Sequence, residues 1–375
     1  MKRRILTLAL AGLLLLTGCS SMLEQTYVRE EHLTENEASG GEDYLLVEDE
    51  NQLSNAIFRL VDQGESHGVL RLPDWEEADV ERVLGAACLQ VTEEDPLGAY
   101  AVAGIRYRSS HIISYYEVEL EISYRHTREQ TEELVQLTNN SALRSEMRTV
   151  LGDFSPEALF RVRYFSGDEE SVRELIRAAY YETPAAALGE PAVTVKLYPA
   201  HTAGSERIVE VQLAYPEEPE ILRAKQRETL DAAEKLLTEL GDVRGDEAVR
   251  AAYRYLYRRC AGAVPGEEKG SAWAVLTRDA CDSRGMALTM ELLCQYAGVE
   301  CMTVSGRKNG ERCTWNIVRL AGGEYRHVDA TAEDGCLCSD AGMLALGYTW
   351  DRTDGSLPLC GEQPPEDEKT AQSEN

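Results

Sequence analysis

The chain has 375 residues, 43% of them hydrophobic, and its 66 acidic residues against 38 basic ones give a formal net charge of −28. A chain of this length exceeds one typical domain and has enough apolar residues for two or three cores. So negative a charge excludes sequence-independent binding to nucleic acid phosphates or to an anionic lipid surface.

The N-terminus has the pattern of an export signal. Basic residues at positions 2–4 precede an apolar run over residues 5–16, which is too short to span a membrane and predicts a signal peptide over residues 1–18. The residues Leu-Thr-Gly before Cys19 resemble the bacterial lipoprotein cleavage box. This resemblance implies that Cys19 becomes lipid-modified and holds the mature chain at the outer face of the cell membrane. An ordinary signal peptide, cut near small residues, is the alternative.

Two stretches have the composition of unfolded chain. Residues 19–50 are rich in acidic residues and contain the pair Gly40-Gly41, which predicts a lipid-anchored, solvated tether. Residues 362–375 contain Pro364-Pro365 and no apolar periodicity, so we predict a disordered tail there. The folded domains are therefore expected between these two stretches.

Residues 51–126 predict a first β-α-β-β module. The expected elements, in chain order, are a helix over 51–64, a strand over 69–72, a helix over 74–88, and strands over 100–108 and 113–125. Asp74 and Glu77 have the spacing of a capping box, which favours a helix start at this point.

The same order of elements returns about ninety residues later, which predicts an internal repeat. At a constant offset of 91, Val118, Leu120, Ile122 and Tyr124 map onto Val209, Val211, Leu213 and Tyr215. Residues 127–218 are therefore expected to form linking helices, over 127–139 and 141–151, and a second β-α-β-β module. The alternation on the strands predicts that one face of each sheet is covered by its helix.

The segment after residue 219 has the only catalytic pattern in the chain. A cysteine-histidine enzyme needs a thiolate at a helix N-terminus, an imidazole within hydrogen-bond reach, and a group that orients the imidazole. The residues that bear on this pattern are Ser283-Arg-Gly285-Met-Ala287, then Gly298, then Cys313-Thr-Trp315-Asn316, and finally Val328-Asp329-Ala-Thr331.

This order is similar to that of transglutaminase-like (papain-related) domains, which have Cys-x-Gly-aromatic-Ala at a helix start, His-x-Trp-Asn on one strand and Val-Asp-x-Thr on the next. The resemblance covers about residues 245–360. It implies that residues 219–361 form a transglutaminase-like α+β domain. The predicted fold class of the whole chain is thus α+β, with two tandem β-α-β-β modules followed by this domain.

Two of the three reactive positions depart from the family pattern. Counting fifteen residues back from Gly298 places Ser283 at the nucleophile position, and Cys313 stands at the histidine position, so only Asp329 remains. A thiol does not accept a proton near neutral pH as an imidazole does, and loss of triad members removes on the order of 10⁶ in kcat. We therefore predict an inactive domain that binds or scaffolds a peptide or cell-envelope ligand in a groove that includes Trp315 and Asn316.

Two alternatives remain open at this point. The first is an active cysteine peptidase or amide acyl transferase that uses Cys281 with His327 and Asp329. If Cys313 lies opposite Asp329 in a hairpin, His327 is a diagonal neighbour ~7–8 Å from position 313. The second is a purely structural domain whose groove is filled by its own side chains.

The other cysteines suggest structural roles. After Cys19, nine cysteines remain, an odd number for an exported chain. Cys294 and Cys301 flank the helix end and predict a disulfide, and Cys336 or Cys338 is expected to reach Cys260 or Cys360. The chain has no Cys-x-x-Cys pair with matching histidines, so we expect neither a zinc site nor another cofactor.

Overall fold

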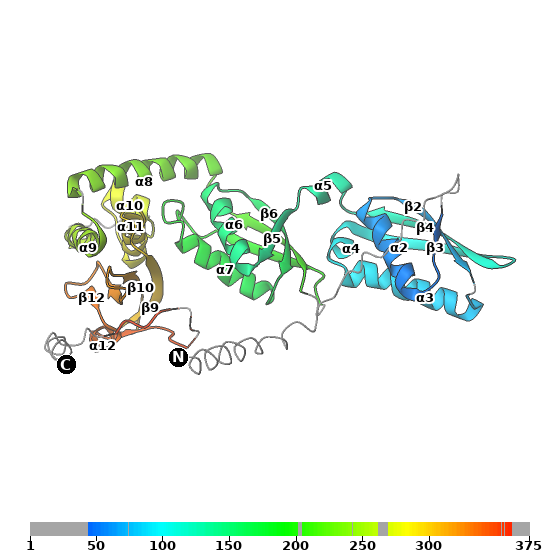
Figure 1. Ribbon diagram of the computed structural model, residues 1–375. Helices are drawn as coiled ribbons and strands as arrows, with labels where there is room; N and C mark the ends of the chain where they lie inside the picture. Colours follow the sequence, from blue (N-terminus) through cyan, green and yellow to red (C-terminus); the bar gives the residue numbers. More distant parts are fainter. Residues whose placement is uncertain are drawn as a thin grey trace, which may run out of the picture. The chain divides into compact units, whose positions relative to one another are not determined.

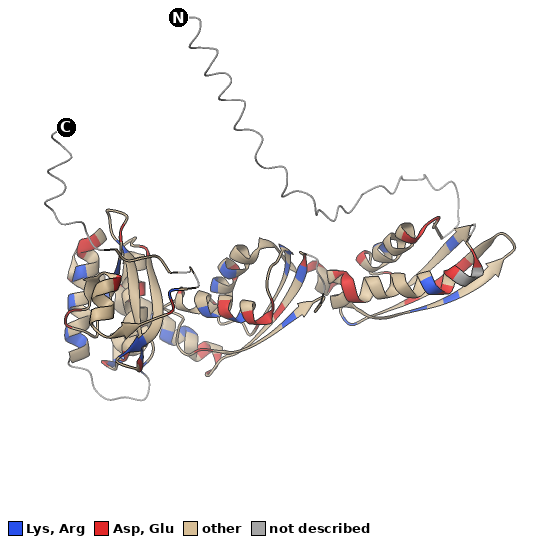
Figure 2. Ribbon diagram, turned by 90° about the horizontal axis from the view of Figure 1, so that it is seen from below, with Lys and Arg blue, Asp and Glu red and all other residues tan. Residues whose placement is uncertain are grey.

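The computed structural model describes residues 44–73, 75–201, 205–241, 243–261, 269–353, 355 and 357–361 (Figure 1). The predicted signal peptide, Cys19, the tether up to residue 43 and the tail over 362–375 lie outside the described residues. The described part is a mixed α/β structure with three sheets. Acidic and basic residues both occur along its helices (Figure 2). None of the described helices combines the length and the apolarity that a membrane span requires.

The first sheet has the strand order β1-β2-β4-β3 and packs one face against two helices. Its unit consists of β1 (Leu45–Leu46), α2 (Glu50–Asp62), β2 (His67–Pro73), α3 (Glu77–Leu89), the π-helical turn η1 (Gln90–Glu94), α4 (Pro96–Ala101), β3 (Val102–Ile112) and β4 (Tyr115–Tyr124). The predicted alternation on β4 buries Val118, Leu120 and Ile122 beneath α2 and α3. The tether ends earlier than predicted, because Leu45 and Leu46 pair with β2.

The second sheet has the equivalent strand order, β5-β6-β8-β7. Its unit consists of α5 (Arg128–Glu132), β5 (Val135–Asn139), α6 (Asn140–Gly152), β6 (Glu157–Tyr164), α7 (Glu169–Tyr181), β7 (Ala192–Tyr198) and β8 (Arg207–Ala214). Here too the two helices, α6 and α7, pack on one face, where Val209, Val211 and Leu213 of β8 are buried. Strands β4 and β8, which carry the residues related by the offset of 91, occupy the same place in the two sheets.

Two sequence predictions about these units are wrong in detail. The helix expected over 127–139 stops at Glu132, and Val135–Asn139 instead forms β5, which pairs in parallel with β6. The strand expected from residue 100 begins at Val102, because Asp95 caps the short helix α4. Each sheet therefore has one strand more than predicted, β1 or β5, while the helices expected over 51–64 and 141–151 form as α2 and α6.

The third sheet has the order β12-β11-β10-β9-β13, and all its neighbours are antiparallel. The elements of this region are α8 (Pro219–Leu240), α9 (Gly245–Ala261), α10 (Ala272–Arg278), α11 (Ser283–Tyr296), β9 (Cys301–Lys308), β10 (Glu311–Arg319), β11 (Tyr325–Val328), β12 (Cys336–Cys338), α12 (Asp340–Ala345) and β13 (Tyr348–Thr349). Helix α11 packs against Val318 and Val328 on one face. The other face carries Trp315, Ile317 and Tyr348.

Helix α11 begins and ends where the sequence predicts. The side chain of Asp282 caps it by accepting a hydrogen bond from the Gly285 N–H over 2.8 Å. The helix ends at Tyr296, and Gly298 follows with φ +67°, a left-handed conformation that favours glycine. Ser283 is consequently the first residue of the helix, at the end where the helix dipole favours negative charge.

The register of the β10–β11 hairpin differs from the predicted one by two residues. Asn316 pairs with Val328 and Ile317 pairs with His327, whereas the prediction placed Cys313 opposite Asp329. The difference arises in the connecting loop, where the Leu320 N–H donates to the Glu324 carbonyl over 2.8 Å. Strand β10 continues to Arg319 and β11 begins at Tyr325, so the turn lies one residue later in the chain than predicted. His327 therefore lies farther along the hairpin from position 313 than the sequence indicated.

All nine cysteines of the described residues are free thiols. The Cys301 thiol hydrogen-bonds that of Cys294, so these two residues are adjacent as predicted but are not joined. Cys260 contacts Cys281 rather than Cys336 or Cys338. The expected partners of Cys260 were wrong because α9 packs beside the loop that leads into α11.

Candidate functional site

A cavity of about 710 Å³ opens at the N-terminal end of α11, beside β9 and β10. Ser283 and Cys313 both line it, so the structure brings together the two positions that the family pattern assigns to the nucleophile and the histidine. Trp350 and Thr349 contribute to its wall from the segment at β13. The groove is thus open to a ligand of substantial size, which counts against a domain whose groove is filled by its own side chains.

Ser283 is held by the neighbouring strand. Its Oγ accepts a hydrogen bond from the Thr314 N–H over 3.2 Å, which fixes the start of α11 against β10. Among the described residues, no imidazole or carboxylate hydrogen-bonds this hydroxyl. A serine hydroxyl without an adjacent base is a weak nucleophile, so the position is geometrically in place but not activated.

Cys313 stands where the family has its histidine, and its surroundings keep it protonated. Burial raises the pKa of the Cys313 thiol to about 11, and the negative charge of Asp329 adds to this effect while Lys308 opposes it. Its cross-strand partner is Gly306, where a Cβ atom would lie 2.5 Å from the Trp315 ring. The thiol is therefore neutral near pH 7 and is not a base for Ser283.

Asp329 is the one predicted triad position that has its expected residue, and both of its carboxylate oxygens accept hydrogen bonds. It is 2% exposed, and its Oδ1 accepts hydrogen bonds from the Thr331 N–H (2.8 Å) and hydroxyl (2.6 Å). Its Oδ2 accepts a hydrogen bond from the Tyr348 hydroxyl over 2.5 Å. Burial and this bond to Asp329 raise the pKa of Tyr348 well above its ordinary value, so the phenol stays protonated. Tyr348 was not among the site residues predicted from the sequence.

His327 is held away from the groove. The Trp315 indole N–H donates to Nδ1 over 2.9 Å, and Nε2 lies 2.8 Å from Asp340 Oδ1. An indole only donates, so Nδ1 carries no proton and Nε2 donates to Asp340. Burial lowers the pKa of His327, although the bond to Asp340 opposes the shift. The ring is a neutral imidazole with both nitrogens engaged.

The structure does not bring Cys281, His327 and Asp329 together. Cys281 lies against Cys260 in the α9–α11 core, and burial raises its pKa to about 11. His327 packs on the opposite face of the sheet, with Trp315 and Trp350.

Trp315 and Asn316, expected at the groove, are both buried beneath it. Asn316 Nδ2 donates to the Ala287 carbonyl over 3.1 Å and ties β10 to α11, while Trp315 points to the other face. The two residues support the groove and do not line it.

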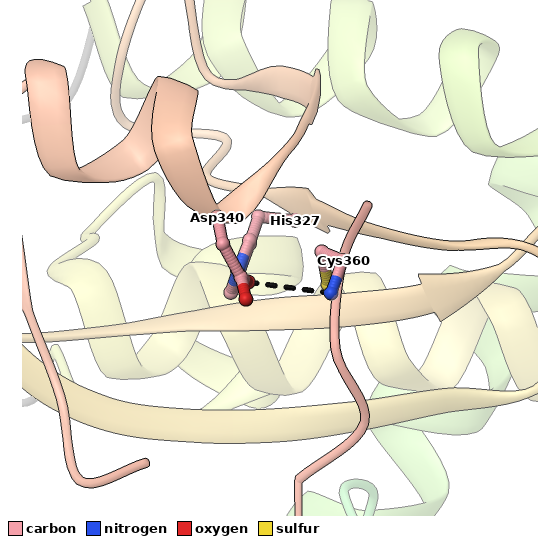
Figure 3. Close-up of side chains that lie close together, drawn as sticks. All are labelled: His327, Asp340 and Cys360. Carbon is pink, nitrogen blue, oxygen red and sulfur yellow. Dashed lines mark hydrogen bonds and ion pairs between the residues drawn. The ribbon is translucent and has the colours of Figure 1, made fainter. Parts of the chain in front are cut away.

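His327, Asp340 and Cys360 form a compact cluster, with their potential ligand atoms within 4.8 Å of one another (Figure 3). The donors fit a metal poorly. Because Nδ1 accepts the Trp315 N–H, a metal on Nε2 would require an imidazolate, and burial raises the pKa of the Cys360 thiol to about 12. The cluster instead fastens the C-terminal segment, since Asp340 N–H donates to the Cys360 carbonyl (2.8 Å) and Asp340 Oδ1 accepts from the Cys360 N–H (3.3 Å).

The chain was compared with known families and structures. No family model and no characterised protein matches its sequence. Among solved structures it is similar to a TGase, with 13% identity, a TM-score of 0.27, and coverage of 69% of this chain and 72% of that one. A protein from Cytophaga hutchinsonii, provisionally assigned as a cysteine protease, has 14% identity, a TM-score of 0.24 and coverage of 46% and 74%. A provisionally assigned protease from Parabacteroides distasonis has 8% identity, a TM-score of 0.19 and coverage of 72% and 44%.

Proposed function

We propose that residues 219–361 form a transglutaminase-like domain that has lost its reactive groups and binds an extended peptide or cell-envelope peptide without cleaving it. One observation carries the proposal: Ser283 and Cys313 line an open groove, while the Asp329 carboxylate beside them is hydrogen-bonded by Tyr348. A groove with a few polar groups remains a ligand site after its nucleophile is lost. The two preceding units are then tandem modules that carry this domain.

The chemistry of the groove residues supports a binding role over a catalytic one. Ser283 has no base, Cys313 is neutral near pH 7, and both ring nitrogens of His327, the only histidine after residue 201, are engaged elsewhere. Acyl transfer needs both an activated nucleophile and a group that moves its proton. The groove residues provide neither.

The test combines thiol labelling with ligand binding. The full-length protein is treated with iodoacetamide at neutral pH, the labelled cysteines are mapped by mass spectrometry, and binding and cleavage of cell-wall peptides are measured in parallel. We expect labelling no faster than for a free thiol, and binding without cleavage. Rapid labelling of Cys281 that disappears in His327→Ala, or turnover of any bound peptide, would contradict the proposal.

We propose further that the lipid on Cys19 holds the protein at the outer face of the cell membrane. The support is the sequence of the export signal and of the residues before Cys19. Expression of the chain in a bacterial host with radiolabelled palmitate should label the wild type, and Cys19→Ala should be unlabelled and appear in the soluble fraction. A Cys19→Ala protein that remains with the membrane would exclude this anchor.

A further inference from the structure

The groove is basic, although the chain as a whole is strongly acidic. Its lining includes Arg284, Arg307 and Arg312 but only one carboxylate, that of Asp351. The formal charge of the entire chain is −28. At physiological ionic strength charges are screened within about 8 Å, so a ligand in the groove experiences these arginines more strongly than the distant acidic residues.

Two of these arginines face each other directly. Arg307 on β9 and Arg312 on β10 are cross-strand partners, and both are exposed at the groove. Like charges at directly opposite positions of an antiparallel pair destabilise the sheet. Without a ligand, the two guanidinium groups repel each other. An anion placed between them would attract both groups and make the arrangement favourable.

Neither guanidinium of this pair is neutralised within the described chain. Arg307 Nη1 donates only to the Gly310 carbonyl, over 2.7 Å, and no carboxylate of the described residues forms an ion pair with Arg307 or Arg312. Asp351 Oδ1 accepts from the N–H (2.8 Å) and the hydroxyl (2.7 Å) of Thr353. Arg284, in contrast, already has Glu190 at 3.5 Å. The Arg307–Arg312 pair is thus the part of the groove available to an external anion.

The size of the groove favours a peptide over a small ion. A volume of about 710 Å³ exceeds what one carboxylate or phosphate group occupies. The lining extends from Ser283 at the start of α11 to Thr349 and Trp350 at the edge strand β13. An extended segment can therefore lie along this path with one acidic side chain, or its terminal carboxylate, at the arginine pair.

We infer that the groove recognises an acidic peptide, and that Arg307 and Arg312 together bind one of its carboxylates. This inference rests on the proposed peptide-binding function and adds the class of ligand. Arginine is suited to this role because its planar fork of N–H donors matches the two oxygens of a carboxylate. Ser283, which also lines the groove, is not required for the preference.

The experiment compares two fluorescein-labelled hexapeptides, one of glutamate and one of glutamine, binding to the full-length protein by fluorescence anisotropy. We expect the glutamate peptide to bind at least about tenfold more tightly. Arg307→Gln combined with Arg312→Gln should remove this preference. Arg319→Gln is the matched control. Arg319 is exposed and lies on β10, the strand of Arg312, but it is paired with Glu300 at 3.3 Å.

The outcomes separate this inference from the proposed function. Equal binding of the two peptides would overturn the acidic preference while leaving peptide binding intact, whereas binding of neither peptide would count against the proposed function itself. Inorganic phosphate is added as a competitor. If phosphate alone displaces the glutamate peptide at comparable concentration, the pair is a site for free anions and the peptide assignment fails. Loss of the preference in Arg319→Gln would also overturn the role of the pair.

Discussion

The indole N–H of Trp315 donates to Nδ1 of His327 over 2.9 Å, on the face of the sheet that lies away from α11. This bond fixes the histidine in the tautomer that carries its proton on Nε2, where it donates to Asp340. His327 is the only histidine after residue 201. The one imidazole after residue 201 is therefore held by these two bonds, and no histidine is among the described residues that line the groove.

This pairing predicts a loss of stability in mild acid. Burial lowers the pKa of His327 in the folded protein, whereas in the unfolded chain it titrates near 6.5. The contribution of neutral His327 to the free energy of unfolding is thus complete above pH 6.5. It is lost as the pH falls from 6.5 toward the pKa of His327 in the folded protein. Urea unfolding between pH 5 and 8 should show a smaller pH dependence for His327→Gln than for the wild type. Identical slopes for the two proteins would contradict a lowered pKa of His327 in the folded protein.

Glu291 has the opposite dependence on pH. It is 3% exposed on α11, and burial raises its pKa to about 8, although the Thr303 hydroxyl bonds it at 2.9 Å. As the pH rises above about 4.5, the unfolded chain ionises first, so folding becomes less favourable up to about pH 8. Glu291→Gln should therefore stabilise the protein by on the order of 2–3 kcal/mol at pH 7 and leave it unchanged at pH 4.

The matched control for this measurement is Glu300→Gln, an exposed carboxylate paired with Arg319. Loss of such a surface ion pair changes the free energy of unfolding by about 1 kcal/mol or less. A stabilisation by Glu291→Gln that does not vary between pH 4 and pH 7 would indicate a packing effect and would argue against a buried, protonated Glu291.

The sequence could place the groove but not the contacts that its residues make. Counting back from Gly298 located Ser283, the Trp315-Asn316 pattern located Cys313, and the structure puts both on one cavity, because helix starts and strand positions are local properties. The bond between Tyr348 and Asp329 joins residues 19 apart and depends on how β13 returns to the sheet, which no periodicity encodes. The hairpin register failed for a related reason, since a turn centred one residue later in the chain changes every pairing.

The proposed loss of the reactive groups can be tested by restoring them. Restoring the family residues with Ser283→Cys and Cys313→His, together with Tyr348→Phe to free Asp329, would place a thiol at a helix N-terminus beside an imidazole. Both features lower a thiol pKa. We expect the new cysteine to react with iodoacetamide at pH 7 at least about tenfold faster than in Ser283→Cys alone. If the two rates are equal, the geometry at positions 283 and 313 is not that of a catalytic pair.

The last prediction concerns the hydrogen bond between the Tyr348 hydroxyl and Asp329. Tyr348→Phe leaves Asp329 Oδ2 without its donor in a site that is 2% exposed, and an unsatisfied buried carboxylate oxygen costs about 1.5–3 kcal/mol. Tyr325→Phe is the control, because its hydroxyl bonds Glu300 at 2.9 Å on the exposed surface and its loss should cost less than about 0.5 kcal/mol. Chemical denaturation at pH 7 gives both values. Equal losses in the two variants would mean that the hydrogen bond from Tyr348 to Asp329 contributes little to stability. Tyr348 would then act through the packing of its ring against Trp315.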